Sequence, residues 1–186
     1  MGRLKQRPFL NTSGVVNKIS KIKKSSMLQH DSSDCGAACL VSVIRYFGGN
    51  STIENIRKLS GTTMSGSSML GLYQAANQCG MNATGYEASV EDIIGYGNVL
   101  ILHITLKEGF DHYIISYGYE DGKFSIWDPA KGLALMSKDE LGKLWLSKKC
   151  LGLVPNKTFK SEKEDKKGKL EWLKRTVKPE KDLLIV

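Results

Sequence analysis

The chain has 186 residues and a formal net charge of +8, with 41% hydrophobic and 25% charged residues. This length suffices for one domain of roughly 130 residues plus tails. Residues 1–26 hold seven Lys/Arg and no acidic residue, and residues 157–186 hold ten against six, which leaves −3 for residues 27–156. The central part therefore lacks the basic face of a nucleic-acid-binding domain, and we expect no nucleic-acid partner.

Residues 1–26 are predicted to form a basic N-terminal extension. They contain no apolar stretch of signal-peptide length, so export is not expected. Within them, residues 15–24 read V-V-N-K-I-S-K-I-K-K, which fits either a short strand or a helix. No run of about 18 apolar residues occurs in the sequence, so no membrane-spanning helix is predicted.

Residues 29–40 read Q-H-D-S-S-D-C-G-A-A-C-L and place a cysteine at the start of an apolar helical pattern. Ser33 or Asp34 is expected to cap this helix, one apolar face is expected to point inward, and the glycines at residues 48–49 end it. Cys35 then lies in the first turn, where free N–H groups and the helix dipole stabilise a thiolate. The charge of Asp34 would oppose this effect if it lay close to the sulfur.

Small residues follow the cysteine, and Gly36 and Ala37 are expected to leave room for a peptide to approach the sulfur. Cys39 lies one turn later and is interpreted as a small core residue. The spacing C-x3-C without a second Cys/His pair is a weak zinc signal, so no metal is expected. Four unpaired cysteines fit a reducing cytoplasm better than a disulfide scaffold.

The middle of the chain predicts further helices and then mostly strands. Gly61 and Gly80 are expected to end two of the helices, and Ser51 or Thr52 and Ser89 to begin two of them. Helices packed against an antiparallel sheet define an α+β fold. Helices are predicted at residues 53–60, 69–79, 90–94 and 138–146, and strands near residues 81–88, 99–106, 112–119, 123–128 and 150–154.

Three histidines are candidates for a general base. His30 lies in a predicted loop, and His103 lies in an apolar strand, where a core histidine with satisfied hydrogen bonds is expected. His112 opens the strand at 112–119, and Asp128 ends the next strand. A hairpin through the turn at residues 120–122 would bring these two side chains together.

A thiol hydrolase needs a nucleophile, a base, a group that orients the base, and a donor for the oxyanion. Cys35, His112, Asp128 and Gln29 supply these groups in chain order. An isolated unpaired cysteine is more often a buried core residue. The other three residues favour the nucleophile for Cys35.

The pattern Q-x5-C-G, followed by a histidine and then Asp-Pro, resembles the peptidase family C39 domain of bacterial ABC exporters for bacteriocins and peptide pheromones. The resemblance covers residues 27–155 and implies a papain-like cysteine protease fold with N-terminal helices packed on a C-terminal antiparallel sheet. It implies Cys35, His112 and Asp128 as catalytic residues and Gln29 in the oxyanion hole. It implies no cofactor in this domain, because ATP belongs to a nucleotide-binding domain outside the chain.

The resemblance also implies a substrate and partners. The substrate would be a precursor of a bacteriocin-, lantibiotic- or pheromone-type peptide, with a helical leader ending in Gly-Gly or Gly-Ala and cut just after it. Its partners would be the transmembrane and ATPase domains of the same transporter, on the cytoplasmic side of the bacterial inner membrane. Residues 156–186 would be a charged linker toward a membrane domain, although an ordinary apolar terminus also fits. The sequence assigns no leader-binding residues.

Two alternatives remain open at this point. One is a related domain that binds leader or cargo without cutting, although such domains lose the cysteine that this chain keeps. The other is a different Cys-His-Asp enzyme of acyl transfer, such as a transglutaminase or an acyltransferase.

Overall fold

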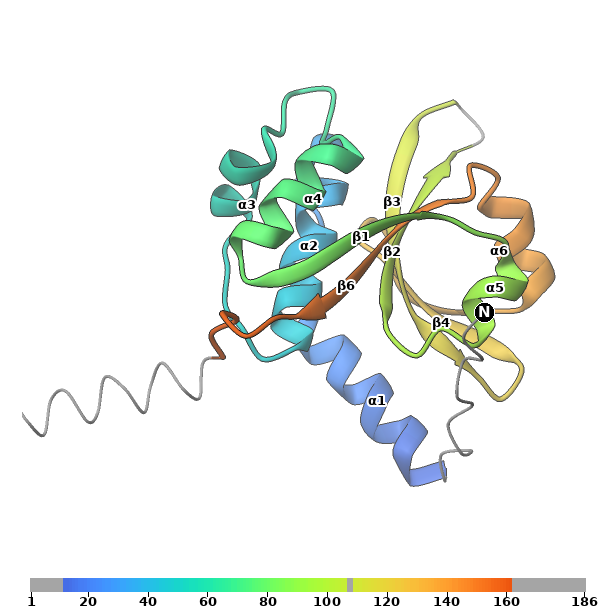
Figure 1. The fold of residues 1–186 in the computed structure, drawn as a ribbon. Helices are drawn as coiled ribbons and strands as arrows, with labels where there is room; N and C mark the ends of the chain where they lie inside the picture. The colour runs from blue at the N-terminus through green and yellow to red at the C-terminus, as the bar shows by residue number, and fades with distance from the viewer. Residues whose placement is uncertain (1–11, 107–108, 162–186) are drawn as a thin grey trace, which may run out of the picture.

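The computed structural model describes residues 12–106 and 109–161, and its helices and strands form one layered α+β arrangement (Figure 1). Six antiparallel strands form one sheet in the order β1-β6-β2-β3-β4-β5. The predicted fold class is confirmed. The helices are α1 (Thr12–Ser25), α2 (Cys35–Tyr46), α3 (Ile53–Ser60), α4 (Met69–Gln78), α5 (Val90–Ile94) and α6 (Lys138–Leu144), with a 3-10 turn η1 (Ser32–Asp34) before α2. The strands are β1 (Met81–Glu87), β2 (Val99–Thr105), β3 (Asp111–Glu120), β4 (Lys123–Asp128), β5 (Gly132–Met136) and β6 (Lys149–Pro155).

Two apolar clusters form the core, one on each face of the sheet. Successive strand residues point to opposite faces, so Ile115 joins the cluster around α2 and Ile114 joins the cluster around α5 and α6. In Figure 1, α2, α3 and α4 lie together on one side of the sheet and α5 and α6 on the other. Helix α2 thus packs against a continuous apolar face of the sheet.

Helix α2 is buried on nearly all sides, which differs from the predicted single apolar face. Ten of its 12 residues are buried. Arg45, expected to face solvent, is half-buried and donates to the carbonyl oxygen of Ser51 at 3.3 Å. The helix runs between the sheet and the pair α3–α4, so its N-terminus is held in place by packing.

The predicted helix ends are confirmed where local side chains set them. The hydroxyl of Thr52 accepts from the backbone N–H of Asn55 at the start of α3, and Gly61 ends that helix at φ 62°. Ser89 and Asp92 form a reciprocal capping box at α5. Gly80 follows α4 with φ 79°, a conformation that glycine adopts at no steric cost.

The hairpin between β3 and β4 turns at Asp121 (φ 49°) and Gly122 (φ 81°), the positive values that a type I′ turn requires. Strand β5, which was not predicted, pairs with β4 and places Gly132 opposite Asp128. Its sequence G-L-A-L-M contains no β-branched or aromatic residue, so it carries a weak strand signal.

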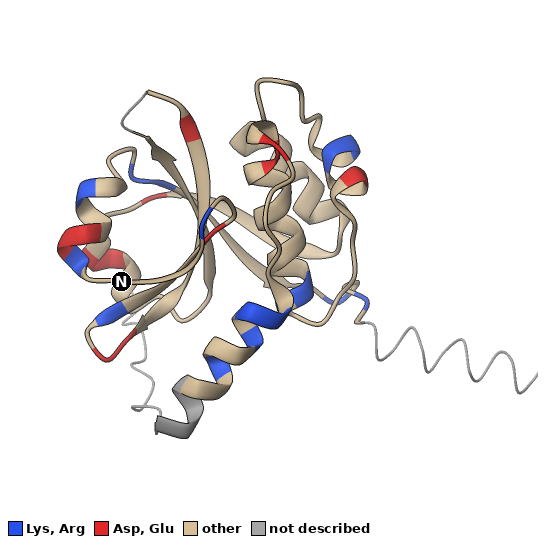
Figure 2. Ribbon diagram, turned by 180° about the vertical axis from the view of Figure 1, so that it is seen from behind, with Lys and Arg blue, Asp and Glu red and all other residues tan. Residues whose placement is uncertain are grey.

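Residues 15–24, for which helix and strand both fitted, belong to helix α1. Ile22 is fully buried in the same cluster as Cys35, and Lys18 forms an ion pair with Glu120 at 2.8 Å. Lys21 lies 4.0 Å above the ring of Tyr46. Figure 2 shows Lys residues along this helix as it projects from the rest of the fold. Within the described residues, no helix is long and apolar enough to cross a membrane.

Candidate active site

Cys35 is the first residue of α2 and is 4% exposed. The turn η1 immediately precedes it. The cap of this turn is Asp31, whose carboxylate accepts from the backbone N–H of Ser33 at 2.9 Å. Of the two residues predicted to cap α2, Asp34 is the one found at the cap position. Asp34 occupies the cap position without a capping hydrogen bond, because its carboxylate accepts from a stronger donor, the guanidinium of Arg57.

His112 and Asp128 lie side by side at the end of the β3–β4 hairpin. Nε2 of His112 is 2.8 Å from Oδ1 of Asp128, and both residues are buried. The same carboxylate oxygen accepts from the backbone N–H of Ala130 at 2.8 Å, which fixes its orientation. The side chain of Cys35 also interacts with His112 and contributes to its raised pKa. Since Asp128 occupies Nε2, the ring atom left for the sulfur is Nδ1.

Burial and the neighbouring charges shift the pKa of His112 in opposite directions, and the same holds for the pKa of Asp128. Burial lowers the pKa of His112, but the hydrogen bond and the charge of Asp128, together with the interaction with Cys35, raise it to about 9. Burial raises the pKa of Asp128, but the hydrogen bonds from His112 and Ala130 bring it below the ordinary value. At neutral pH the site therefore holds an imidazolium beside a carboxylate. An imidazolium of this kind stabilises a neighbouring thiolate.

Gln29 belongs to a segment that is tied to the end of β4. Its backbone N–H donates to the carbonyl oxygen of Pro129 at 2.9 Å, and the indole of Trp127 donates to the carbonyl oxygen of Met27 at 3.1 Å. The side-chain amide oxygen of Gln29 is buried and has no hydrogen-bond partner in the described part of the chain. The backbone bond to Pro129 thus holds Gln29 near the hairpin, while its amide oxygen makes no hydrogen bond within the described residues.

The other candidate residues lie outside this group. Cys39 is fully buried, its thiol lies 3.4 Å from the carbonyl oxygen of Tyr113, and burial raises its pKa well above the ordinary value, so it is the core residue that was predicted. His30 is exposed. His103 corrects the prediction of a satisfied core histidine: it is half-buried, its Nε2 lies 3.3 Å from Asp111, and its Nδ1 has no partner in the described residues.

Gly36 has a different role from the one predicted. A Cβ at this position would lie 3.1 Å from side-chain atoms of both Ser67 and Leu72. The missing side chain thus faces α4 and the loop before it, and it permits close packing of α2 rather than access of a peptide to the sulfur.

Arg57 was missed by sequence reasoning. It appeared only as a charged residue on a short amphipathic helix, and nothing in its spacing indicated contact with residues 23 and 26 positions earlier. No group of three His, Cys, Asp or Glu side chains that could hold a metal ion occurs among residues 12–106 and 109–161.

Known proteins resemble this chain in sequence and in fold. The sequence model of the Peptidase C39 family matches residues 23–158. The chain is 32% identical over 127 residues to the lactococcin-G-processing and transport ATP-binding protein LagD of Lactococcus lactis, covering 66% of this chain and 18% of that protein. It is 30% identical over 155 residues to the transport/processing ATP-binding protein ComA of Streptococcus pneumoniae, covering 81% and 21%. The chain thus spans about a fifth of the length of these relatives.

Solved structures of related peptidase domains resemble this chain in fold. The peptidase domain of Streptococcus ComA has a TM-score of 0.65 at 29% identity, with 70% of this chain and 97% of that chain covered. A double glycine motif protease from an AMS/PCAT transporter, solved in complex with the leader peptide, has a TM-score of 0.64 at 28% identity, with 70% and 91% covered. These neighbours confirm the predicted papain-like arrangement. The chain belongs to the Peptidase C39 family.

Proposed function

We propose that this chain is a cysteine endopeptidase that removes the leader from a ribosomally made secreted peptide, cutting after a Gly-Gly or Gly-Ala motif in step with export. The observation that carries the proposal is that Nε2 of His112 lies 2.8 Å from Asp128 and that His112 interacts with Cys35, the first residue of the buried helix α2. A nucleophile, a base and an orienting carboxylate in this order are the parts of a thiol protease.

The proposed reaction is acyl transfer through Cys35. His112 holds the proton given up by the thiol, and Asp128 keeps the imidazole in one orientation. The thiolate attacks the scissile carbonyl carbon, while the amide of Gln29 and a backbone N–H near Cys35 bind the oxyanion. The intermediate collapses as the C–N bond breaks, and His112 donates the proton to the leaving amine. Water, deprotonated by His112, then cleaves the thioester and releases the leader with a new carboxylate.

The substrate and partners follow from the relatives rather than from the geometry. LagD is named for processing and transport of lactococcin G, and the AMS/PCAT protease was solved with a leader peptide. By analogy, the proposed partners are a precursor with a helical leader and the transmembrane and ATPase domains of the same transporter, at the cytoplasmic side of the membrane. The proposed chemistry requires no cofactor in this domain.

The test is incubation of the 186-residue chain with a synthetic precursor whose leader ends in Gly-Gly, followed by mass spectrometry. A matched precursor ending in Val-Val serves as the control, and Cys35→Ala serves as the inactive variant. We expect one cut directly after the second glycine in the first precursor and none in the control. Binding of the precursor by the wild-type chain without a cut would instead indicate a non-cleaving leader-binding domain. Transfer of the acyl group to an added amine without hydrolysis would indicate another enzyme of acyl transfer.

A further inference from the structure

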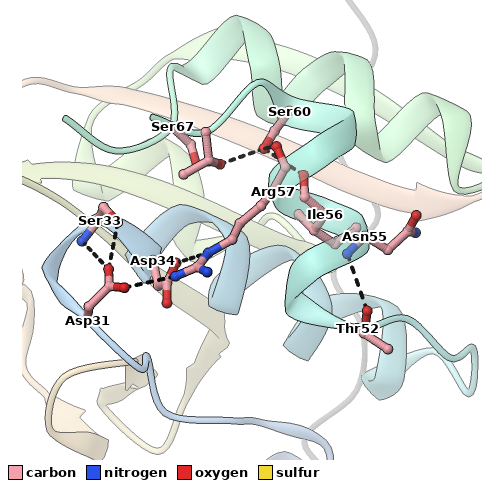
Figure 3. A network of polar contacts seen from close by, with 10 residues as sticks. Asp31, Ser33, Asp34, Thr52, Asn55, Ile56, Arg57, Ser60 and Ser67 are labelled. Carbon is pink, nitrogen blue, oxygen red and sulfur yellow. Dashed lines mark hydrogen bonds and ion pairs between the residues drawn. The ribbon is translucent and has the colours of Figure 1, made fainter. Parts of the chain in front are cut away.

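A buried carboxylate lies directly before the proposed nucleophile. Asp34 is 0% exposed, and its Oδ1 accepts from Nε of Arg57 at 2.5 Å, whereas its Oδ2 is buried without a partner in the described residues. Nη2 of the same guanidinium donates to Oδ2 of Asp31 at 2.8 Å. Figure 3 shows Arg57 reaching from α3 to both carboxylates. One side chain therefore holds both the cap (Asp31) and the last residue (Asp34) of the turn η1, which leads into Cys35.

The positive charge of Arg57 offsets the negative charge of the buried Asp34 carboxylate. A carboxylate next to a thiolate disfavours negative charge on the sulfur, and burial strengthens that repulsion. An isolated buried carboxylate is also costly in itself. Arginine suits the task because it stays charged and presents several N–H donors in a fixed planar fork. Arg57 supplies the missing positive charge beside Asp34 while remaining half-exposed itself.

The same part of the chain also contacts the residue after the cysteine. Ser67 packs where a Cβ of Gly36 would lie. Its hydroxyl hydrogen-bonds Thr62 at 2.6 Å, and Thr62 in turn hydrogen-bonds Ser60, the last residue of α3, at 2.8 Å. Helix α3 and the loop after it thus contact both neighbours of Cys35, Asp34 by charge and Gly36 by packing.

We propose that Arg57 and Asp34 are positioning residues of the thiol site. The guanidinium neutralises the buried carboxylate and anchors the turn, so that the first turn of α2 presents Cys35 to His112 without a competing negative charge. This inference rests on the proposed role of Cys35 as nucleophile.

Other charged groups face the two partners. Arg57 faces the carboxylates of Asp31 and Asp34, and it also interacts with Glu54 on the first turn of α3, which is near His30. The hydrogen bond to Asp34 raises the pKa of the Arg57 guanidinium, so it remains a cation throughout any practical pH range. Cys35 interacts electrostatically with His112, with the phenol of Tyr113 and with the thiol of Cys39.

The test measures the rate of Cys35 alkylation by iodoacetamide against pH, with the Cys35 peptide quantified by mass spectrometry. This readout needs no precursor, so it is independent of peptidase activity. Arg57→Met leaves the Asp34 carboxylate unbalanced, and we expect the midpoint of the alkylation profile to rise by about one pH unit. Asp34→Asn leaves the guanidinium in excess and should lower the midpoint. The double variant removes both charges and should return close to wild type.

Two further variants separate charge from geometry and from a general loss of fold. Arg57→Lys keeps the charge and loses the fork, so it should shift the midpoint less than Arg57→Met does. Lys58→Met removes a neighbouring exposed charge on α3 and should leave the profile unchanged. Melting temperatures are recorded for every variant. If Arg57→Met does not fold, the lysine and double variants carry the comparison.

A wild-type profile in the Arg57 variants, or shifts of the same sign in Asp34→Asn and Arg57→Met, would overturn the inference, since loosening of the fold acts in one direction only. Turnover of a Gly-Gly precursor by Arg57→Met should also fall at least tenfold in kcat with little change in KM. The wild-type chain could cut no precursor while the two single variants still shift the alkylation midpoint in opposite directions. That result would support the positioning pair and contradict the proposed peptidase function.

Discussion

The backbone N–H of Gln29 donates to the carbonyl oxygen of Pro129 at 2.9 Å, which joins the proposed oxyanion donor to the residue that follows Asp128. A second tie, from the Trp127 indole to the carbonyl oxygen of Met27, lies two residues earlier on each side. Two hydrogen bonds therefore join the segment before Cys35 to the end of β4. The proposed oxyanion donor, Gln29, and the proposed orienting carboxylate, Asp128, have their positions set by the same strand end.

Replacing Cys35 by alanine should abolish cleavage of a Gly-Gly precursor and leave leader binding nearly intact. The sulfur is required for the acyl-enzyme, while a helical leader needs an extended apolar surface away from it. Binding is measured by fluorescence anisotropy of a labelled leader and cleavage by mass spectrometry. The matched variant Cys39→Ala should keep turnover but lose about 1 kcal/mol of unfolding free energy, because it removes a fully buried side chain. Cleavage by Cys35→Ala at the wild-type rate would end the thiol-protease proposal.

Asp128→Asn should lower kcat much more than it changes KM. An orienting group acts mainly in the transition state, so its loss leaves substrate binding largely untouched. Alkylation of Cys35 by iodoacetamide should also slow, because the imidazolium loses its carboxylate partner at 2.8 Å. Both rates are measured on the same preparation. Full activity of this variant would mean that the His112–Asp128 contact is structural only.

The stability of the fold should fall as pH rises from 6.5 to 9. The pKa of His112 is about 9 in the folded chain against an ordinary 6.5. The stabilisation of the folded state by protonated His112 is therefore fully present below pH 6.5, where both the folded and the unfolded chain bind the proton. Above that value the unfolded chain releases its proton first, and the contribution is lost as pH passes 9. We expect a decrease on the order of 2–3 kcal/mol in unfolding free energy, measured by urea denaturation at constant temperature. The decrease should be shallower in Asp128→Asn, and equal slopes in both proteins would assign it to other groups.

Gly71→Ala should destabilise the chain despite the higher helix propensity of alanine. A Cβ at Gly71 would lie 2.1 Å from the backbone carbonyl oxygen of Ser60, so α3 and α4 would have to separate. We expect a loss of about 2–3 kcal/mol in urea denaturation, against a propensity gain of about 1 kcal/mol. Gly85→Ala is the control, because a Cβ at Gly85 meets no atom within 4 Å. A stable Gly71→Ala protein would show that the contact between α3 and α4 can relax without cost.

The sequence predicted those parts of the fold that short-range side-chain chemistry determines. Thr52 and Ser89 each begin a helix by accepting a hydrogen bond from the backbone N–H three residues later. The turn at Asp121 and Gly122 forms the hairpin, and together with the register shift between Ser116 and Tyr119 it brings His112 to Asp128. Three features depended on contacts distant in sequence and were not predicted: the helical state of α1, the edge strand β5 and the pairing of Arg57 with Asp34. In each case the local pattern allows several structures, and contact with another element selects one: packing of Ile22 for α1, pairing with β4 for β5, and the ion pair for Arg57.

The role of Gln29 is tested by separating thiol reactivity from amide hydrolysis. Gln29→Ala should leave alkylation of Cys35 near wild type, since the thiolate depends on the helix terminus and on His112. Turnover of a Gly-Gly precursor should fall about 100- to 1000-fold in kcat, the usual cost of losing one oxyanion donor.

The melting temperature distinguishes this role from a structural one. The Gln29 amide oxygen has no partner in the described residues, and the tie to Pro129 uses the backbone, which the variant keeps. The fold should therefore melt near the wild-type temperature while turnover collapses. Gln29→Glu is the matched variant: it keeps the length of the side chain but replaces the donor by a negative charge, so it should be no more active than alanine. Parallel loss of alkylation, turnover and melting temperature in Gln29→Ala would show that the side chain supports the loop instead of the oxyanion.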